Sequence, residues 1–202
     1  MQPRMHIQER GALHNEVSSL LFRYQFFTRI FSCVGLFLLF TTLFSPFWLT
    51  VIQSKTPINV GLWNICKDHT CQKLVAKTKS LHLIRSLMSL STISGLIAVA
   101  CVLITKPSLK NSNWPLFTNL FTGILALITM VLYGLSLKFK TLFGHPVPDT
   151  TEPIYISWCF VMGCFASFLF LLNGLLFILI AIEEDSTTHF YIRERKNLDE
   201  TT

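Results

Sequence analysis

The chain has 202 residues, of which 51% are hydrophobic and 14% charged, and its mean hydropathy is +0.51. A soluble domain carries about 25% charged residues, so this composition indicates a membrane protein. The net charge of +6 is spread over short segments and forms no basic stripe, which argues against a nucleic-acid partner. No nucleophile–base pair, phosphate-binding loop or shared histidine spacing occurs, so the sequence predicts no enzyme, no metal site and no cofactor.

Residues 1–29 are mostly polar and carry four arginines. A polar segment of this length is not a cleavable signal peptide, so we expect the first apolar run to act as a signal anchor. Apolar residues become frequent from Val17 onwards. We interpret this part as a frayed extension of the first membrane span, with a short helix on the membrane surface as the alternative.

Four apolar runs follow, and each is long enough to cross the hydrocarbon layer, which takes about 20 residues. They predict membrane spans at about 30–52, 82–105, 116–137 and 154–182. Small residues four positions apart let helices approach closely, which predicts helix packing at two pairs, Ser91 with Gly95 and Gly163 with Ser167.

Few polar groups are expected inside this bundle. Asn173 falls near the middle of the fourth span, where we expect it to hydrogen-bond a neighbouring helix rather than a substrate. The spans hold no Asp, Glu or Lys, and Arg85 is close to a boundary, so a pump or transporter is disfavoured. Cys33 and Cys101 fall near inner helix ends, where palmitoylation competes with burial as a small hydrophobic residue.

The segment 53–81 holds the only close cysteine pair outside the spans. The stretches 49–53, 59–66 and 71–75 are suited to a small antiparallel sheet. Cys66 and Cys71 would then face each other across a polar turn, close enough for a disulfide that contributes about 2 kcal/mol. A reduced pair and a metal site that includes His69 are the alternatives.

Gly61-Leu62-Trp63 is followed by Cys66 and Cys71, Trp48 lies upstream in a Pro-x-Trp motif, and Arg85 opens the second helix. These motifs, all in the first half of the chain, resemble the signature of the claudin and peripheral myelin protein superfamily. Claudins place more residues between the two cysteines, so the tight spacing is more similar to orphan branches of the superfamily.

The resemblance and the four spans together predict an all-α membrane protein, a left-handed bundle of four transmembrane helices with a small antiparallel extracellular β-sheet. The membrane domain would be 30–182, with outer loops 53–81 and 138–153, a cytosolic segment 1–29 and a cytosolic tail 183–202. Positive charges do not decide the orientation, but a disulfide needs the oxidising side, which leaves both termini in the cytosol.

Three residues near the outer membrane surface have expected roles. Trp48 suits an interfacial anchor. Trp63 is expected on the outer leaflet beneath the sheet, with a contact to a partner as the alternative. Arg85 is expected to tie the sheet to the helices by bonding loop carbonyls, with a lipid phosphate as the alternative.

The function that we expect is a claudin-like organiser in the plasma membrane, which binds membrane proteins laterally or across a cell contact. Its expected partners are the lipid bilayer, an unidentified membrane protein and other copies in a lateral oligomer. A regulatory subunit of a channel or receptor is the alternative, and a paracellular pore comes third.

Overall fold

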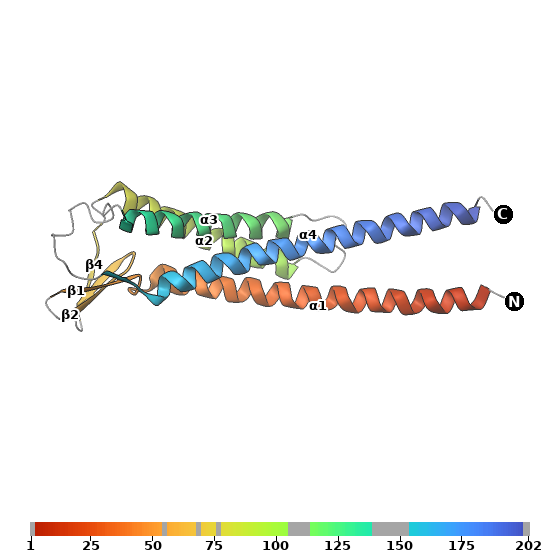
Figure 1. Cartoon of the computed structure of the whole chain (residues 1–202), viewed down its shortest axis with the longest axis horizontal. Helices are drawn as coiled ribbons and strands as arrows, with labels where there is room; N and C mark the ends of the chain where they lie inside the picture. Colours follow the sequence, from red (N-terminus) through yellow and green to blue (C-terminus); the bar gives the residue numbers. More distant parts are fainter. Residues whose placement is uncertain are drawn as a thin grey trace.

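The computed structural model describes the backbone of residues 3–53, 56–67, 70–75, 78–104, 114–138 and 154–199. Its elements are α1 (Pro3–Phe44), β1 (Leu49–Gln53), β2 (Thr56–Val60), β3 (Asn64–Lys67), β4 (Thr70–Lys73), α2 (Lys79–Ile104), α3 (Trp114–Lys138), β5 (Ile154–Ile156) and α4 (Trp158–Asp199). The helices lie side by side, and the sheet lies at one end of the bundle (Figure 1).

Each helix contains a segment long and apolar enough to cross a membrane. The four segments are Arg23–Phe44, Lys79–Ile104, Trp114–Leu137 and Trp158–Leu179. With the antiparallel sheet, they confirm the predicted fold class. Both α1 and α4 run on beyond these segments, and the N- and C-terminal ends lie away from the sheet (Figure 1).

The sheet has five strands in the order β4-β3-β2-β1-β5, and each neighbouring pair is antiparallel. The predicted strand 49–53 is β1. The predicted strand 59–66 is wrong as one element, because the chain leaves the sheet after Val60 and re-enters it at Asn64. The fifth strand, β5, comes from the second outer segment and was not predicted.

Two predicted span boundaries are wrong. The first span does not run to residue 52, because α1 ends at Phe44. Ser45 closes the last turn by donating its backbone N–H to the Thr41 carbonyl at 3.0 Å. The helical conformation is unfavourable for a residue that precedes a proline, and Ser45 precedes Pro46. The fourth span does not begin at 154, because β5 pairs with β1 there and α4 begins at Trp158.

The amino-terminal part of α1 is continuous with the first span from Pro3. This agrees with the predicted extension of the first span, and α1 is one helix rather than a span preceded by a separate surface helix. Other predictions fall outside the described residues. These are most of the second outer loop 138–153, the metal-site alternative at His69, and the side chains of residues 1–22 and 183–202.

The buried core runs from the bundle into the base of the sheet. Leu39, Met88 and Phe170 are fully buried among the helices, and Leu62 joins the same cluster from the loop between β2 and β3. Because one continuous apolar core spans both parts, the sheet has a fixed position on the bundle.

Candidate functional site

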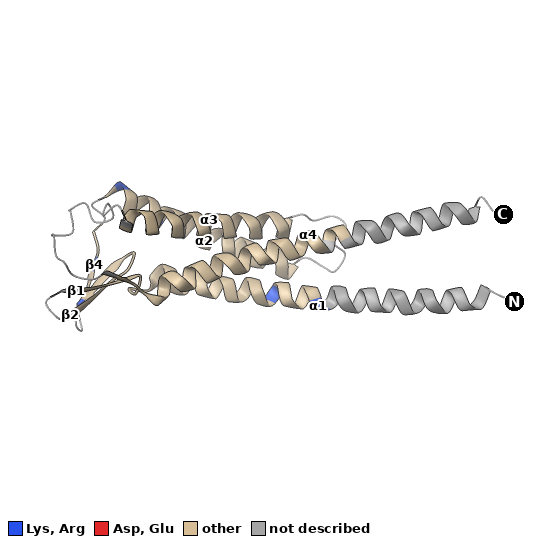
Figure 2. Cartoon of the chain, viewed as in Figure 1, with Lys and Arg blue, Asp and Glu red and all other residues tan. Residues whose placement is uncertain are grey.

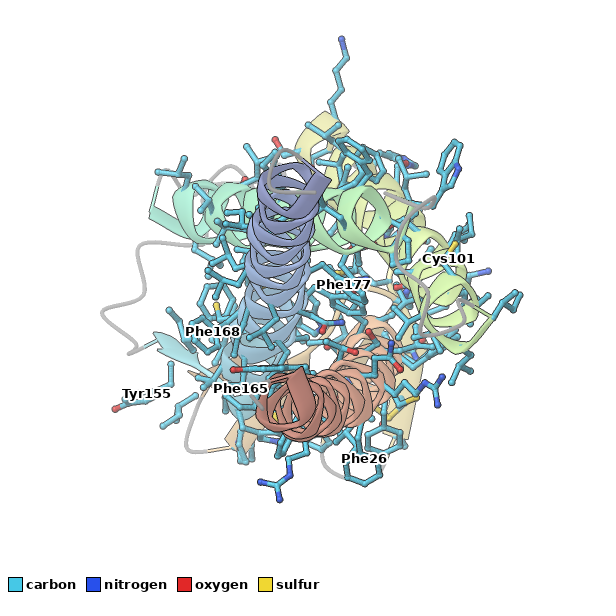
Figure 3. The ribbon with its side chains drawn as sticks, turned by 90° about the vertical axis from the view of Figure 1, so that its right-hand side faces the viewer. Phe26, Cys101, Tyr155, Phe165, Phe168 and Phe177 are labelled. Carbon is cyan, nitrogen blue, oxygen red and sulfur yellow. A yellow bond between two sulfur atoms is a disulfide. The ribbon has the colours of Figure 1, made fainter. Side chains whose placement is uncertain are left out.

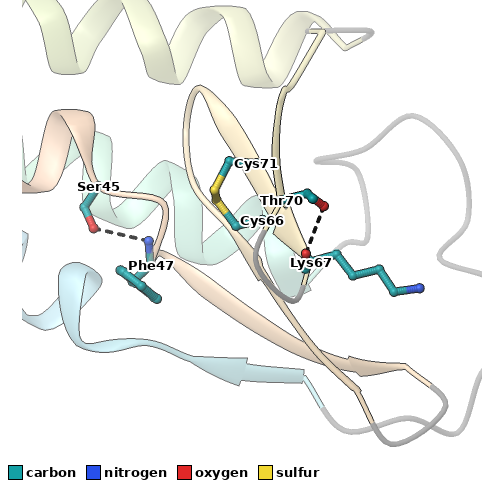
Figure 4. The surroundings of a disulfide bond; sticks show 6 residues. All are labelled: Ser45, Phe47, Cys66, Lys67, Thr70 and Cys71. Atoms are coloured by element: carbon teal, nitrogen blue, oxygen red, sulfur yellow. Dashed lines mark hydrogen bonds between the residues drawn. A yellow bond between two sulfur atoms is a disulfide. The ribbon is translucent and has the colours of Figure 1, made fainter.

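The outer hairpin of β3 and β4 is closed by a disulfide between Cys66 and Cys71 (Figure 4). These residues are direct partners in the register, and their Cα atoms are 4.1 Å apart. Thr70 donates its hydroxyl to the Lys67 carbonyl at 3.1 Å, next to the turn. All four residues of β4 are exposed, so this hairpin presents backbone and side chains at the end of the protein that carries the sheet.

Arg85 joins this hairpin to α2. Its Nε donates to the Leu62 carbonyl at 2.7 Å, and its Nη2 donates to the Leu74 carbonyl at 2.8 Å. Leu62 precedes β3 and Leu74 follows β4, so one guanidinium holds both ends of the hairpin. Both acceptors are loop carbonyls, and a charged donor such as a guanidinium makes the stronger kind of hydrogen bond to them.

The Gly61-Leu62-Trp63 segment supports these Arg85 contacts with Leu62 and Leu74, which we call the clamp. Leu62 is fully buried in the core, and the half-buried Trp63 packs against it. The guanidinium carbon of Arg85 lies 5.0 Å from the centre of the Trp63 ring, a cation–π contact. A Cβ on Gly61 would lie 2.5 Å from the Ser45 carbonyl oxygen, so only glycine fits this approach of the loop to the end of α1.

Trp48 is not the interfacial anchor that the sequence suggested. Its side chain is fully buried, its Nε1 donates to the Thr42 carbonyl at 2.6 Å, and its ring lies 4.8 Å from the Tyr133 ring. The backbone of Trp48 also pairs with Val60 and Ser157, because it sits between the sheet and the bundle. Trp48 is therefore part of the joint between the two.

The sequence comparison agrees with this architecture. A model of the PMP-22/EMP/MP20/Claudin family matches residues 23–177, which include the first three membrane segments, the described sheet and all but the last two residues of the fourth segment. The chain belongs to this family. Membership supports a non-enzymatic membrane protein. A search of curated proteins finds no significant match.

The claudin-like bundle holds a buried polar cluster formed by Thr28, Ser32, Asn119 and Asn173, which we call the inner cluster. The Asn173 amide nitrogen contacts the Thr28 carbonyl at 3.2 Å, the Asn119 Oδ1 at 3.0 Å and the Ser32 hydroxyl. Ser32 in turn donates to Asn119 Oδ1 at 3.2 Å. These bonds link α1, α3 and α4.

The position of the inner cluster corrects the expectation that Asn173 lies near mid-membrane. It is level with Thr28, in the first turns of the Arg23–Phe44 segment, and with Asn119, near the start of α3 at Trp114. The cluster therefore lies at the end of the bundle away from the sheet. The sequence shows the polar residues, but not that Ser32 and Asn119 meet Asn173.

The small-residue pairs lie at helix contacts. Ser91 donates to the Thr122 carbonyl at 3.4 Å, and Ser167 donates to the Gly123 carbonyl at 2.9 Å, so both reach α3. Among the glycines, a Cβ on Gly95 would lie 3.3 Å from Leu36 Cδ1, and one on Gly163 would collide with the Met130 side chain.

The outside of the bundle is apolar. Phe26, Phe165 and Phe168 are more than half exposed and point away from the helices, whereas Phe177 is buried and points inward (Figure 3). Among the side chains that the structure describes, which lie within residues 23–182, the charged ones are all Lys or Arg (Figure 2). A surface of this kind contacts lipid along the helices and leaves charge near the ends.

Among the described residues, the cysteines outside the disulfide and the metal-ligating side chains form no further site. Cys33 is exposed and Cys101 is partly buried, and no group of three metal-ligating side chains occurs there. Cys33 lies well inside the Arg23–Phe44 segment, rather than close to its inner end.

Proposed function

We propose that this claudin-family protein organises other membrane proteins, laterally or across a cell contact, through its outer sheet. The observation that carries the proposal is the clamped hairpin. A disulfide closes it, Arg85 fixes both of its ends, and all of β4 is exposed. A rigid, exposed element supports binding, because little conformational entropy is lost when a partner docks.

The bundle interior supports binding rather than transport. Its buried polar side chains are Ser, Thr and Asn, and the described core includes no Asp, Glu, Lys or Arg. Most of these groups bond to one another or to helix carbonyls, as in the inner cluster. Ion and proton pathways use charged residues inside the membrane, which this core lacks.

The orientation that we propose has the sheet outside the cell and both termini in the cytosol, in the plasma membrane. The Cys66–Cys71 disulfide supports it, because disulfides persist on the oxidising side of a membrane. Epitope tags at the two termini of the expressed chain should be protease-resistant in intact cells and cleaved after permeabilisation. A tag that is cleaved in intact cells would overturn this orientation.

A regulatory subunit of a channel or receptor is the second candidate. The outward face of α3 favours it, since large apolar residues there recur at alternating spacings of four and three. They are Phe117, Phe121, Ile124, Ile128, Val131 and Leu135, all exposed. A stripe with this spacing packs along a partner helix as well as against lipid.

Proximity labelling separates the two candidates. A labelling enzyme on the carboxyl terminus would be used in native cells, grown sparse or in contact, with an unrelated four-span protein as the reference. Under the proposed function, adhesion and contact proteins are enriched, and Arg85→Met at matched surface level reduces that enrichment. Enrichment of one channel complex that survives Arg85→Met but falls in Ile124→Ala/Ile128→Ala would favour the second candidate. No enrichment above the reference would contradict both.

A further inference from the structure

The outer edge of β4 carries backbone groups that the sheet does not use. In an antiparallel pair, directly opposed residues alternate between exchanging hydrogen bonds and facing each other without them, and the second kind lie closer. The opposed Cys66 and Cys71 have Cα atoms only 4.1 Å apart, so they belong to the second kind. The neighbouring pair of Ile65 with Gln72 then exchanges the bonds.

Two backbone hydrogen bonds fix the same alternation. Leu74 donates to the Trp63 carbonyl at 2.7 Å, which continues the bonded set two residues beyond Gln72. Gly61 donates to the Asn64 carbonyl at 2.8 Å. The backbone groups of Asn64 and Cys66, the β3 residues that do not bond β4, are therefore turned toward β2. It follows that the N–H and C=O groups of Cys71 and Lys73 point away from β3. Among the described strands, none lies on that side of β4.

The edge is also held in place. Cys71 is tied to β3 by the disulfide, and Leu74, directly after β4, accepts from Arg85. An incoming strand would therefore meet a preformed template, with the two outward donors and two outward acceptors of Cys71 and Lys73.

The charge around the edge favours one class of partner. Lys67 is the last residue of β3, next to the turn, and Lys73 is the last residue of β4, at the open end of the hairpin. The segment 53–81 carries five lysines and one acidic residue. A lysine on an edge strand, here Lys73 on β4, opposes pairing with a second copy, which brings the same charge. Opposite charges on neighbouring strands are favourable, so Lys73 attracts an acidic strand.

We propose that the open edge of β4 binds an extended acidic segment of a partner protein by strand addition. The inference rests on the proposed function, in which the outer sheet is the contact surface, and it names the chemistry of the contact. Alternate residues of the bound segment would carry carboxylates on the face of the sheet to which Lys73 belongs, while its backbone pairs with Cys71 and Lys73.

The test uses the full chain in nanodiscs of zwitterionic lipid and a labelled, end-capped peptide of eight alternating Thr and Glu residues. Fluorescence anisotropy should show binding that weakens with salt, while the matching Thr–Lys peptide should not bind. Lys73→Gln should weaken binding up to about fivefold, the range for one exposed cross-strand charge pair. Lys79→Gln is the matched control, because it removes a lysine at the start of α2, and it should change binding less than about twofold.

The backbone part of the proposal has its own variant. Lys73→Pro removes an outward N–H that β3 does not use, and proline is tolerated on an edge strand. It should weaken binding about tenfold or more, beyond Lys73→Gln, because it removes the hydrogen bond as well as the charge. In the parent, hydrogen exchange at the Cys71 and Lys73 amides should slow when the peptide binds, while Gln72 is already protected.

Several results would overturn the proposal. They are absence of peptide binding, equal effects of Lys73→Gln and Lys79→Gln, and peptide binding without protection of the two amides. If the Cys71 and Lys73 amides are protected from hydrogen exchange without peptide, and the protection rises with protein density, the edge binds a second copy. If anionic lipid alone protects these amides, the edge binds the membrane surface. Labelling that depends on Arg85 while the peptide fails to bind would leave the proposed function standing and remove only this inference.

Discussion

Replacing Asn173 with leucine tests whether the inner cluster holds the helices together. The Asn173 amide has two hydrogens but lies near three acceptors, on Thr28, Ser32 and Asn119, so it makes about two full hydrogen bonds at a time. Hydrogen bonds between membrane helices contribute about 0.6 kcal/mol each on average. Asn173→Leu should therefore lower the free energy of unfolding by about 1 kcal/mol.

Two features of the cluster limit the loss. Ser32 still donates to Asn119 in the variant, so these two groups keep a partner. The Asn173 Oδ1 is buried without a hydrogen-bond partner in the described structure, and leucine removes that unfavourable acceptor. Both effects keep the expected loss in the free energy of unfolding at about 1 kcal/mol, below the roughly 3–5 kcal/mol lost when a buried ion pair is broken.

The matched control is Thr129→Val. Thr129 is also fully buried, but its hydroxyl donates to the Leu125 carbonyl of its own helix at 2.8 Å and bridges no other helix. Unfolding of the purified chain by denaturing detergent in mixed micelles, followed by circular dichroism, would measure each variant. We expect the control to stay within about 0.5 kcal/mol of the parent.

A double-mutant cycle of Asn173→Leu with Ser32→Ala would measure their direct coupling, which should be about 0.6 kcal/mol. Equal stability of Asn173→Leu and Thr129→Val would refute the bridging role. A variant that unfolds like the parent but no longer captures partners would move Asn173 from helix packing to a binding site.

The remaining predictions concern the outer half of the protein. Gly61→Ala should cost about 1–3 kcal/mol in the same unfolding assay, since its Cβ would lie 2.5 Å from the Ser45 carbonyl oxygen. Gly134→Ala is the control, because its Cβ would have nothing within 4 Å, and it should be neutral to slightly stabilising, since alanine favours a helix more than glycine. Equal effects of the two changes would contradict the close approach at Gly61. Cys66→Ser should lose about 2 kcal/mol and be retained in the secretory pathway, and normal surface biotinylation would argue against that role. In epithelial cells that lack claudins, the chain should leave transepithelial resistance and ion selectivity at background, because the strands β2, β3 and β4 in the segment 53–81 are only four or five residues long, which is short for lining a pore. A charge-selective conductance altered by Lys73→Glu would restore the pore hypothesis.

The sequence predicts the membrane segments well but not where they end on the outer side. Hydropathy continues without a break from α1 into β1, and an apolar strand of a few residues looks the same as more helix in such a profile. Pro46 marks the boundary, because α1 ends two residues before it. The strand propensity of 49–53 competes with the span at the same positions, and in the structure the strand prevails.

Contacts between residues far apart in the sequence explain the other features that the sequence did not predict. β5 exists because Ile154–Ile156 pair with β1, a contact far along the chain that local sequence does not show. The acceptors of Arg85 are backbone carbonyls, which carry no sequence signal of their own. Trp48 looked interfacial by position, but the Thr42 carbonyl satisfies its indole N–H, which allows full burial.

The family motif residues meet at one joint, and this explains how the outer hairpin can be short. The backbone around Gly61 touches the end of α1 at Ser45, Leu62 fills the core, and Arg85 reaches the hairpin from α2. None of these contacts involves the turn beyond the disulfide. The length of the turn can therefore change while the joint stays intact, and the edge formed by Cys71 and Lys73 keeps its position next to that joint.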